Sequence, residues 1–389
     1  MKIFLTAGEP SGDTLGAALI DGLRSEVPDV ELRGVAGPRM QAAGMESLFP
    51  MRELSVMGIA EVLPKYFHLK RRIRETAQAA LDWGADIVVT IDSPDFSLRV
   101  QRLIREACPD QHTVHYVAPT VWAWRPERAG KMAKTINHVL ALFPFEPPYM
   151  QAAGMACDFV GHPIATWDPV TATEISDLRA EAGLGDGPLA AVLAGSRGSE
   201  VKRLLPIFAG ALGHKPLPEG TRLIFPTLPH LAPAIAQATQ ALPYPVTILD
   251  GAGQDADQAA RARHVAMAAS NLALAASGTI SLELAHAGTP MVIAYDMAPL
   301  TKWVVKRKLI TDTVTLVNLV SETRAVPEFI FEDCTPDKIA AALAQLHGAR
   351  AAQEAAMAVT MDRLGQGGPP PGLRAAQAIL AQAQSSGVV

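Results

Sequence analysis

Two turns that each lead from a short apolar run into a helical pattern constrain this chain more than any other feature. The first is AGEPSGD at 7–13, and the second is SGTISLE at 277–283. Ligands of α/β sheets bind at the carboxyl ends of strands, where such turns lie. The second turn offers backbone N–H groups at a helix start, which suits a phosphate. The first carries Glu9 and Asp13, which would repel one. The pair predicts two Rossmann-like halves, with a phosphate-bearing ligand on the C-terminal half only.

Apolar runs of strand length alternate with helical patterns along the chain. They lie at 3–5, 86–91, 114–117 and 139–143, and then at 189–193, 222–225, 246–249, 272–276 and 291–294. Continuous apolar strands between helices indicate a parallel sheet that is covered on both faces. We therefore expect an α/β fold with a first domain at 1–165, a second at 166–345 and C-terminal helices at 346–389.

Length and charge narrow the class of protein. A chain of 389 residues suits two or three domains at about 150 residues each. The net charge of −5 argues against nucleic acid as the main partner. Cys108, Cys157 and Cys334 form no CxxC pair, so neither a disulfide framework nor a zinc site is indicated, and a reducing cytoplasm fits.

The N-terminus reaches Glu9 too soon for a signal peptide, and no apolar stretch approaches the length of a membrane span. We expect a soluble or peripheral protein.

Two turns of the C-terminal half form a candidate phosphate site, namely Gly195, Ser196 and Arg197, and Ser277, Gly278 and Thr279. Small residues let a ligand approach the backbone, and Arg197 offers a planar fork of donors. The alternative for the first turn is a solvated loop with a salt-bridging arginine. Glu283 lies one helical turn after Thr279 and can accept hydrogen bonds from ribose hydroxyls. It is equally explained as a first-turn glutamate that the helix dipole favours.

Carboxylates of the N-terminal half form a candidate acceptor site. Asp92 follows the strand at 87–91 and can act as a general base toward a sugar hydroxyl. The alternative is an Asx-turn cap, which is common beside a proline such as Pro94. Glu9, Ser11 and Asp13 can bind acceptor hydroxyls, although Ser11 or Asp13 can instead cap the first helix. The Asp-x-Asp spacing of a metal–nucleotide clamp is missing after the strand, so we expect no obligatory metal. We expect no cofactor either.

Two stretches combine basic with aromatic and apolar side chains, at 63–74 and at 302–310. In an acidic chain such patches suit docking on anionic lipid, at about 1 kcal/mol per basic residue near the surface. The alternative is a solvated helix face over ordinary core contacts. The loop at 116–125 holds two of the five tryptophans beside Arg125 and faces either a ligand or the core. His162 is expected at the crossing between the domains, in a structural role.

Together these motifs resemble the lipid-A-disaccharide synthase family of inverting glycosyltransferases. The matching segments are AGEPSGD at 7–13, GVAGPRMQAAG at 34–44, SVMGIAEVL at 55–63, IDSPDF at 91–96, YVAPTVWAWR at 116–125, FPFE at 143–146, GHP at 161–163, GSRGSE at 195–200, SGTISLE at 277–283 and PMVIAY at 290–295. The resemblance implies the GT-B fold, in which two Rossmann-like domains face a cleft. It also implies that the last helix, 373–384, returns to the first domain.

The resemblance further implies a reaction. UDP-2,3-diacylglucosamine would be the donor and 2,3-diacylglucosamine 1-phosphate the acceptor, giving a β-1,6-linked disaccharide and UDP. Asp92 would deprotonate the acceptor 6-hydroxyl. Arg197, the turn at 277–279 and Asn318 would hold the departing UDP, and Glu283 would bind the ribose. Both substrates carry acyl chains, so the protein is expected in the cytoplasm, peripheral on the inner membrane.

Two other functions remain open at this point. A UDP-GlcNAc 2-epimerase would share the architecture and the nucleotide site, but it needs no surface that faces lipid. A non-catalytic two-domain protein would bind a sugar nucleotide without turnover, and Asp92 would then be dispensable. A dinucleotide dehydrogenase is disfavoured because the first turn has no GxGxxG.

Overall fold

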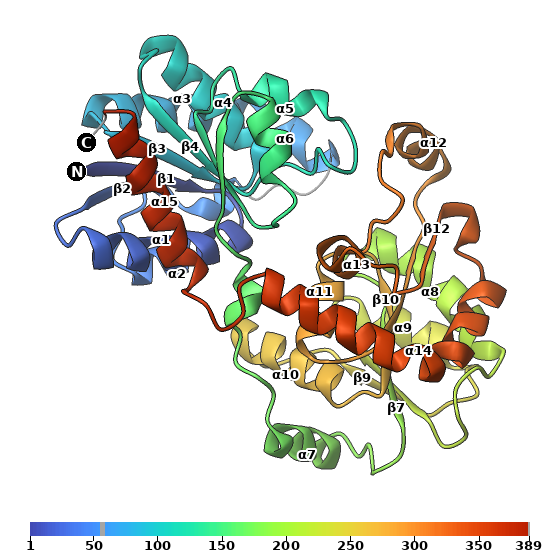
Figure 1. Ribbon diagram of the computed structural model, residues 1–389. Coiled ribbons are helices and arrows are strands. Elements are labelled where there is room, and N and C mark those ends of the chain that lie inside the picture. The colour runs from blue at the N-terminus through green and yellow to red at the C-terminus, as the bar shows by residue number, and fades with distance from the viewer. Residues whose placement is uncertain (55–58, 388–389) are drawn as a thin grey trace. The chain divides into compact units, whose positions relative to one another are not determined.

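The computed structural model describes residues 1–54 and 59–387 and divides into two compact units (Figure 1). The first unit comprises Met1–Thr166 together with the chain from Leu364 onward, and the second comprises Trp167–Arg363. The boundary expected at residue 345 falls inside a continuous helix, α14 (Pro336–Arg363). Residues 55–58, which begin the SVMGIAEVL segment, lie outside the described residues.

The first unit contains a parallel sheet of six strands in the order β2-β1-β3-β4-β5-β6. The strands are β1 (Lys2–Ala7), β2 (Glu31–Val35), β3 (Ile87–Ile91), β4 (His112–Tyr116), β5 (His138–Ala141) and β6 (Ala156–Phe159). The helices are α1 (Pro10–Glu26), α2 (Pro38–Ala42), α3 (Ile59–Trp83), α4 (Pro94–Ala107), α5 (Glu127–Met132), α6 (Pro147–Ala152) and α15 (Pro371–Ser385), with short 3₁₀ turns at Met51–Glu53 and Pro163–Thr166. Alternate residues of β1 and β3 pack on α1 and α15 on one face, and on α3 and α4 on the other. This two-sided burial explains the continuous apolar runs of the strands.

Helix α15 packs directly on α1 in the first unit (Figure 1). Glycines make the approach possible: a Cβ on Gly372 would overlap the carbonyl oxygen of Ala18, and a Cβ on Gly22 would overlap that of Gly372. The Arg374 guanidinium also donates to the carbonyl oxygen of Phe159, at the end of β6, at 2.8 Å. The C-terminal helix is thus part of the hydrophobic core of the first unit.

The second unit repeats the plan with a parallel sheet in the order β12-β11-β10-β7-β8-β9. Its strands are β7 (Leu189–Leu193), β8 (Arg222–Pro226), β9 (Val246–Leu249), β10 (Leu272–Ala276), β11 (Met291–Tyr295) and β12 (Glu328–Ile330). Its helices are α7 (Ala172–Glu181), α8 (Gly198–Gly213), α9 (Ala232–Thr239), α10 (Ala256–Ala268), α11 (Ile280–His286), α12 (Pro299–Lys308), α13 (Leu316–Ser321) and α14, with a 3₁₀ turn at Phe331–Asp333. Helices α8 and α14 supply most of the core on one face of this sheet.

The strand orders place the ligand sites. In each sheet the chain reverses its direction of winding between two neighbouring strands, β1 and β3 in the first unit and β7 and β10 in the second. Ligands of open parallel sheets bind outside the carboxyl ends of such strands. The turns singled out in the sequence follow these four strands. The expected α/β fold with two Rossmann-like units is confirmed.

Candidate active site

Asp92 occupies a constrained position at the carboxyl end of β3. Asp92 and Ser93 both have left-handed backbone conformations, with φ of 52° and 45°. Such residues cost of the order of 1–3 kcal/mol each and persist where their surroundings hold them. Here the Asp92 N–H donates to the carbonyl oxygen of Tyr116 at 2.9 Å, and the Ser97 hydroxyl donates to the carbonyl oxygen of Asp92 at 2.6 Å. Gly8 completes the packing, since a Cβ there would lie 2.6 Å from Ser93 Oγ.

The half-buried Asp92 carboxylate is held at both oxygens. Oδ1 accepts from the backbone N–H of Ser93 at 2.8 Å, and Oδ2 accepts from the hydroxyl of Ser11 at 3.2 Å. Ser93, not Asp92, precedes the first residue of α4, and no side chain caps that helix. The alternative of Asp92 as a helix cap is therefore not what the structure contains. The strained backbone at Asp92 and its carboxylate, held in one orientation, are features that active-site residues often share.

The three residues expected to bind acceptor hydroxyls have different environments. Glu9 precedes α1 with an exposed side chain that does not cap the helix. Ser11 is exposed and donates to Asp92. Asp13 is 2% exposed, and its two oxygens accept from the N–H groups of Arg39 and Met40 at 2.9 and 3.0 Å, at the start of α2. The buried carboxylate of Asp13 fixes α2 against α1, and its contact with the acceptor stays a prediction.

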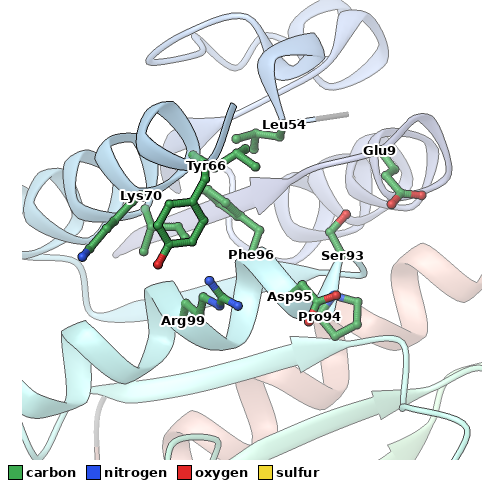
Figure 2. Close-up of a pocket in the computed structure, with 11 residues that line it drawn as sticks. Glu9, Leu54, Tyr66, Lys70, Ser93, Pro94, Asp95, Phe96 and Arg99 are labelled. Carbon is green, nitrogen blue, oxygen red and sulfur yellow. The ribbon is translucent and has the colours of Figure 1, made fainter. Parts of the chain in front are cut away.

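A cavity of about 350 Å³ lies beside this turn in the first unit (Figure 2). It is lined by Glu9, Leu54, Tyr66, Leu69, Lys70, Ile73, Ser93, Pro94, Asp95, Phe96 and Arg99. Four residues come from one face of α3, at the spacing i, i+3, i+4 and i+7, and four come from the first turns of α4. Arg99 was not predicted, because an arginine on an amphipathic helix carries no signal of its own.

Aromatic side chains support the loops that follow β4 and β5. The ring centres of Trp122 and Phe145 lie 5.2 Å apart in an edge-to-face arrangement. The rings of Phe145 and Phe143 are stacked, with their centres 5.4 Å apart. Trp122 is 8% exposed, so this part of the 116–125 loop faces the core. Val117 has a φ of 84°, which is rare for a β-branched residue and marks a further strained turn at this edge of the sheet.

Two buried ionisable groups lie in the same region. Glu146 is 2% exposed, and Oε2 accepts from the N–H groups of Leu142 and Phe143 at 3.1 and 3.0 Å. Burial raises the pKa of Glu146 to about 8, although these two hydrogen bonds oppose the rise. Burial also lowers the pKa of His162 to about 4, and its Nδ1 accepts from the N–H of Ile164. Burial thus favours the uncharged form of both groups.

A second cavity, of about 440 Å³, lies at the reversal point of the second sheet. It is lined by Leu193, Gly195, Ser196, Arg197, Glu200, Pro226, Thr227, Leu228, Arg263, Ala276, Ser277, Gly278, Thr279, Ile280 and Glu283. The structure thus brings seven of the eight predicted donor-site residues together. Gly195 has a φ of 117°, and a Cβ there would lie 2.7 Å from that of Glu200, so this turn requires glycine.

Two arginine–glutamate pairs line the cavity. Arg197 Nη1 lies 3.0 Å from Glu200 Oε1, and Arg263 Nη2 lies 3.1 Å from Glu283 Oε2. The Arg197 side chain is 70% exposed, whereas both glutamates are 16% exposed. The glutamates therefore anchor two guanidinium groups at the cavity. Arg263, on α10, was not predicted because no motif surrounds it.

Asn318 does not line this cavity. It is fully buried on α13, where its Oδ1 accepts from the N–H of Val326 at 3.0 Å and its Nδ2 donates to the Val326 carbonyl at 2.8 Å. With both ends of the amide bonded to protein, it has little left to offer a nucleotide. In this structure the Asn318 side chain fastens α13 to the segment before β12, and its contact with UDP stays a prediction.

The basic and aromatic patches differ in how freely their side chains are presented. On α3, Tyr66 and Phe67 are 45% and 81% exposed, whereas Arg72 pairs with Glu53 at 2.7 Å and is largely covered. On α12, Trp303 is 56% exposed with the Arg307 guanidinium 3.8 Å from its ring centre. The side chains of residues 63–65 lie outside the described ones. None of the helices in the described ranges is long and apolar enough to span a membrane.

Sequence comparisons connect the chain to one family. A family model described as Lipid-A-disaccharide synthetase matches residues 3–374. A lipid-A-disaccharide synthase of Ruegeria pomeroyi is 59% identical over 382 residues, which cover 98% of this chain and 95% of the relative. One of Rhodospirillum centenum is 44% identical over 387 residues, covering 98% and 94%.

Solved structures share the fold at low identity. A UDP-GlcNAc 2-epimerase from Neisseria meningitidis, bound to UDP-GlcNAc, has a TM-score of 0.65 and 14% identity, covering 99% of this chain and all of that one. The calicheamicin glycosyltransferase CalG4 has a TM-score of 0.56 and 17% identity, covering 99% and 98%. The two-unit architecture is thus that of GT-B enzymes. By its sequence, the chain belongs to the lipid-A-disaccharide synthase family and is a glycosyltransferase.

Proposed function

We propose that this protein transfers 2,3-diacylglucosamine from its UDP derivative to the 6-hydroxyl of 2,3-diacylglucosamine 1-phosphate. The products are the β-1,6-linked disaccharide 1-phosphate and UDP. The observation that carries the proposal is the 59% identity to a lipid-A-disaccharide synthase over 98% of the chain. The epimerase alternative shares only the fold, at 14% identity.

Asp92 is the proposed general base. An inverting transfer needs one group that takes the acceptor proton while the hydroxyl attacks the anomeric carbon. The Asp92 carboxylate is half-buried and is fixed at both oxygens by Ser93 and Ser11. As the acceptor hydroxyl gives up its proton to this carboxylate, the bond from the anomeric carbon to the UDP oxygen breaks. No redox step is involved.

The donor is proposed to bind in the cavity of the second unit. The turn before α11 offers backbone N–H groups, and Arg197 and Arg263 offer guanidinium donors for a diphosphate. The N–H groups of Ser196 and Arg197, in the loop after β7, donate to Glu200 Oε2. Glu283 lines the same cavity and can accept from ribose hydroxyls while it orients Arg263. Glu200 and Glu283 keep the two guanidinium groups ordered before the ligand arrives. A diphosphate would then compete with these glutamates for the two arginines.

Both substrates carry acyl chains, and we propose that the protein works at an anionic membrane surface on the cytoplasmic side of the inner membrane. Phe67 on α3 and Trp303 on α12 are large apolar side chains exposed beside basic residues. Aromatic side chains enter the interface while neighbouring cations attract anionic lipid. Arg72 is not assigned to this surface, because its guanidinium is already paired with Glu53 and Glu75.

A direct assay tests the reaction. The purified protein is incubated with UDP-2,3-diacylglucosamine and the acceptor 1-phosphate in detergent micelles, and the lipids are analysed by mass spectrometry. We expect the disaccharide 1-phosphate and equimolar UDP. A parallel incubation with UDP-GlcNAc alone tests for the 2-epimer. Epimer formation without disaccharide would reject the transferase in favour of the epimerase.

A further inference from the structure

The cavity beside Asp92 is polarised along its length (Figure 2). Glu9, Ser93 and Asp95 lie at one end, next to the turn that holds Asp92. Lys70 and Arg99 lie toward the other end. Arg99 is four residues beyond Asp95 on the same face of α4, which places it about 6 Å further along the helix axis at about 1.5 Å per residue.

Lys70 and Arg99 are both exposed. Neither has a hydrogen bond or an ion pair with the side chains that the structure describes, which do not include those of residues 55–65. Their neighbours on the same helices are different. Arg72 on α3 pairs with Glu53, and Arg102 on α4 lies 3.6 Å from Glu106. Glu9 and Asp95 line the same cavity nearer Asp92, so the two cations favour an anionic ligand at their own end of it.

The chemistry of the cation pair favours a phosphate. A guanidinium presents paired N–H donors that match two phosphate oxygens, and an ammonium adds a mobile point charge. The walls between the charged ends are apolar, formed by Leu54, Leu69, Ile73 and Phe96. Such walls suit the face of a sugar ring or the first methylenes of an acyl chain.

We infer that Lys70 and Arg99 bind the phosphate of the acceptor and thereby turn its 6-hydroxyl toward Asp92. The inference rests on the proposed function, which supplies an acceptor with a phosphate on C1 and the reacting hydroxyl on C6. C1 and C5, which carries C6, flank the ring oxygen, so a phosphate held by the two cations leaves the 6-hydroxyl free to reach the end of the cavity where Ser93 adjoins Asp92. Lys70 and Arg99 are therefore specificity-determining residues for a phosphorylated acceptor.

The test compares two acceptors in two assays. The acceptors are short-chain 2,3-diacylglucosamine 1-phosphate and the same lipid without the phosphate; the assays are steady-state transfer and calorimetric binding. For the double variant Lys70→Gln, Arg99→Gln we expect KM and Kd for the phosphorylated acceptor to rise roughly 10- to 100-fold, as when hydrogen bonds to a charged group are lost. Values for the dephosphorylated acceptor should stay within about twofold.

Matched controls are Arg71→Gln and Arg102→Gln, which remove a charge from the same two helices outside the cavity. They should leave the preference for phosphate unchanged. If the wild type turns over but shows no preference for phosphate, or if the double variant keeps that preference in binding, the inference is wrong. If the wild type binds the phosphorylated acceptor through Lys70 and Arg99 but forms no disaccharide, the proposed function fails and the phosphate site stands.

Discussion

Replacement of Glu146 by glutamine should make the stability of the first unit less dependent on pH between about 4.5 and 8. The buried carboxyl has a pKa of about 8 in the folded protein, against 4.5 for an ordinary glutamate. A raised pKa means that the proton stabilises the folded state below pH 4.5, and that this contribution is lost as the pH rises to 8. The loss is about 1.36 kcal/mol per pH unit within this window. Between pH 5.5 and 7.5 it amounts to about 2.7 kcal/mol.

Glu146→Gln does not titrate and keeps an oxygen for the N–H groups of Leu142 and Phe143. The free energy of unfolding of the variant, relative to the wild type at the same pH, should therefore rise by about 2.7 kcal/mol over these two units. Urea unfolding at pH 5.5, 6.5 and 7.5 measures it, with fluorescence of Trp122, whose ring packs on Phe145, as a local probe.

Glu146→Ala separates titration from hydrogen bonding. It also lacks the titration, but it leaves two backbone donors without an acceptor, at a cost of about 1–3 kcal/mol at every pH. Parallel pH profiles for the wild type and the glutamine variant would refute the reasoning. They would mean that the two N–H groups outweigh burial and keep the carboxylate ionised.

Three further predictions concern the donor site, the core and the membrane surface. Arg197→Ala should weaken UDP binding by about 1.5–3 kcal/mol in calorimetry, since it removes a charged donor; unchanged affinity would take Arg197 out of the site. Gly372→Ala should lower the stability of the first unit by about 1–3 kcal/mol in urea unfolding, because its Cβ overlaps the Ala18 carbonyl; an unaltered midpoint would contradict this packing. Trp303→Ser should reduce cosedimentation with anionic vesicles even in high salt, since the indole acts through apolar contact; equal sedimentation would exclude α12 from the surface.

The fold was largely predictable because buried parallel strands are apolar throughout. The strands that escaped prediction, β2, β6 and β12, lie at the edges of their sheets. Each exposes part of its length and mixes polar with apolar residues, so no continuous apolar run marks it. Pattern reasoning detects burial, and an edge strand is only partly buried.

The site was predictable where a motif follows a strand, as at Asp92, Arg197 and the turn before α11. It was not predictable where a side chain arrives from a helix face. Arg99 and Arg263 belong to helices whose patterns show only which side is exposed. Lys70 was predicted only as part of the basic stretch at 63–74, with lipid as its partner. For Asp13 and Asn318 the residue type allowed a ligand contact, but the fold places both where backbone groups need a partner.

The most direct test of the account is the turnover of Asp92→Asn. The amide keeps the size of the side chain, and its nitrogen can donate to the Ser11 hydroxyl, but it cannot take the acceptor proton. Turnover should fall about 10²- to 10⁴-fold, the usual contribution of a general base. UDP affinity should not change, because the donor cavity belongs to the second unit. Asp95→Asn, which neutralises the neighbouring carboxylate, should keep most of the activity. Near-normal turnover of Asp92→Asn, with Asp95→Asn inactive, would contradict the assignment of Asp92 as the base.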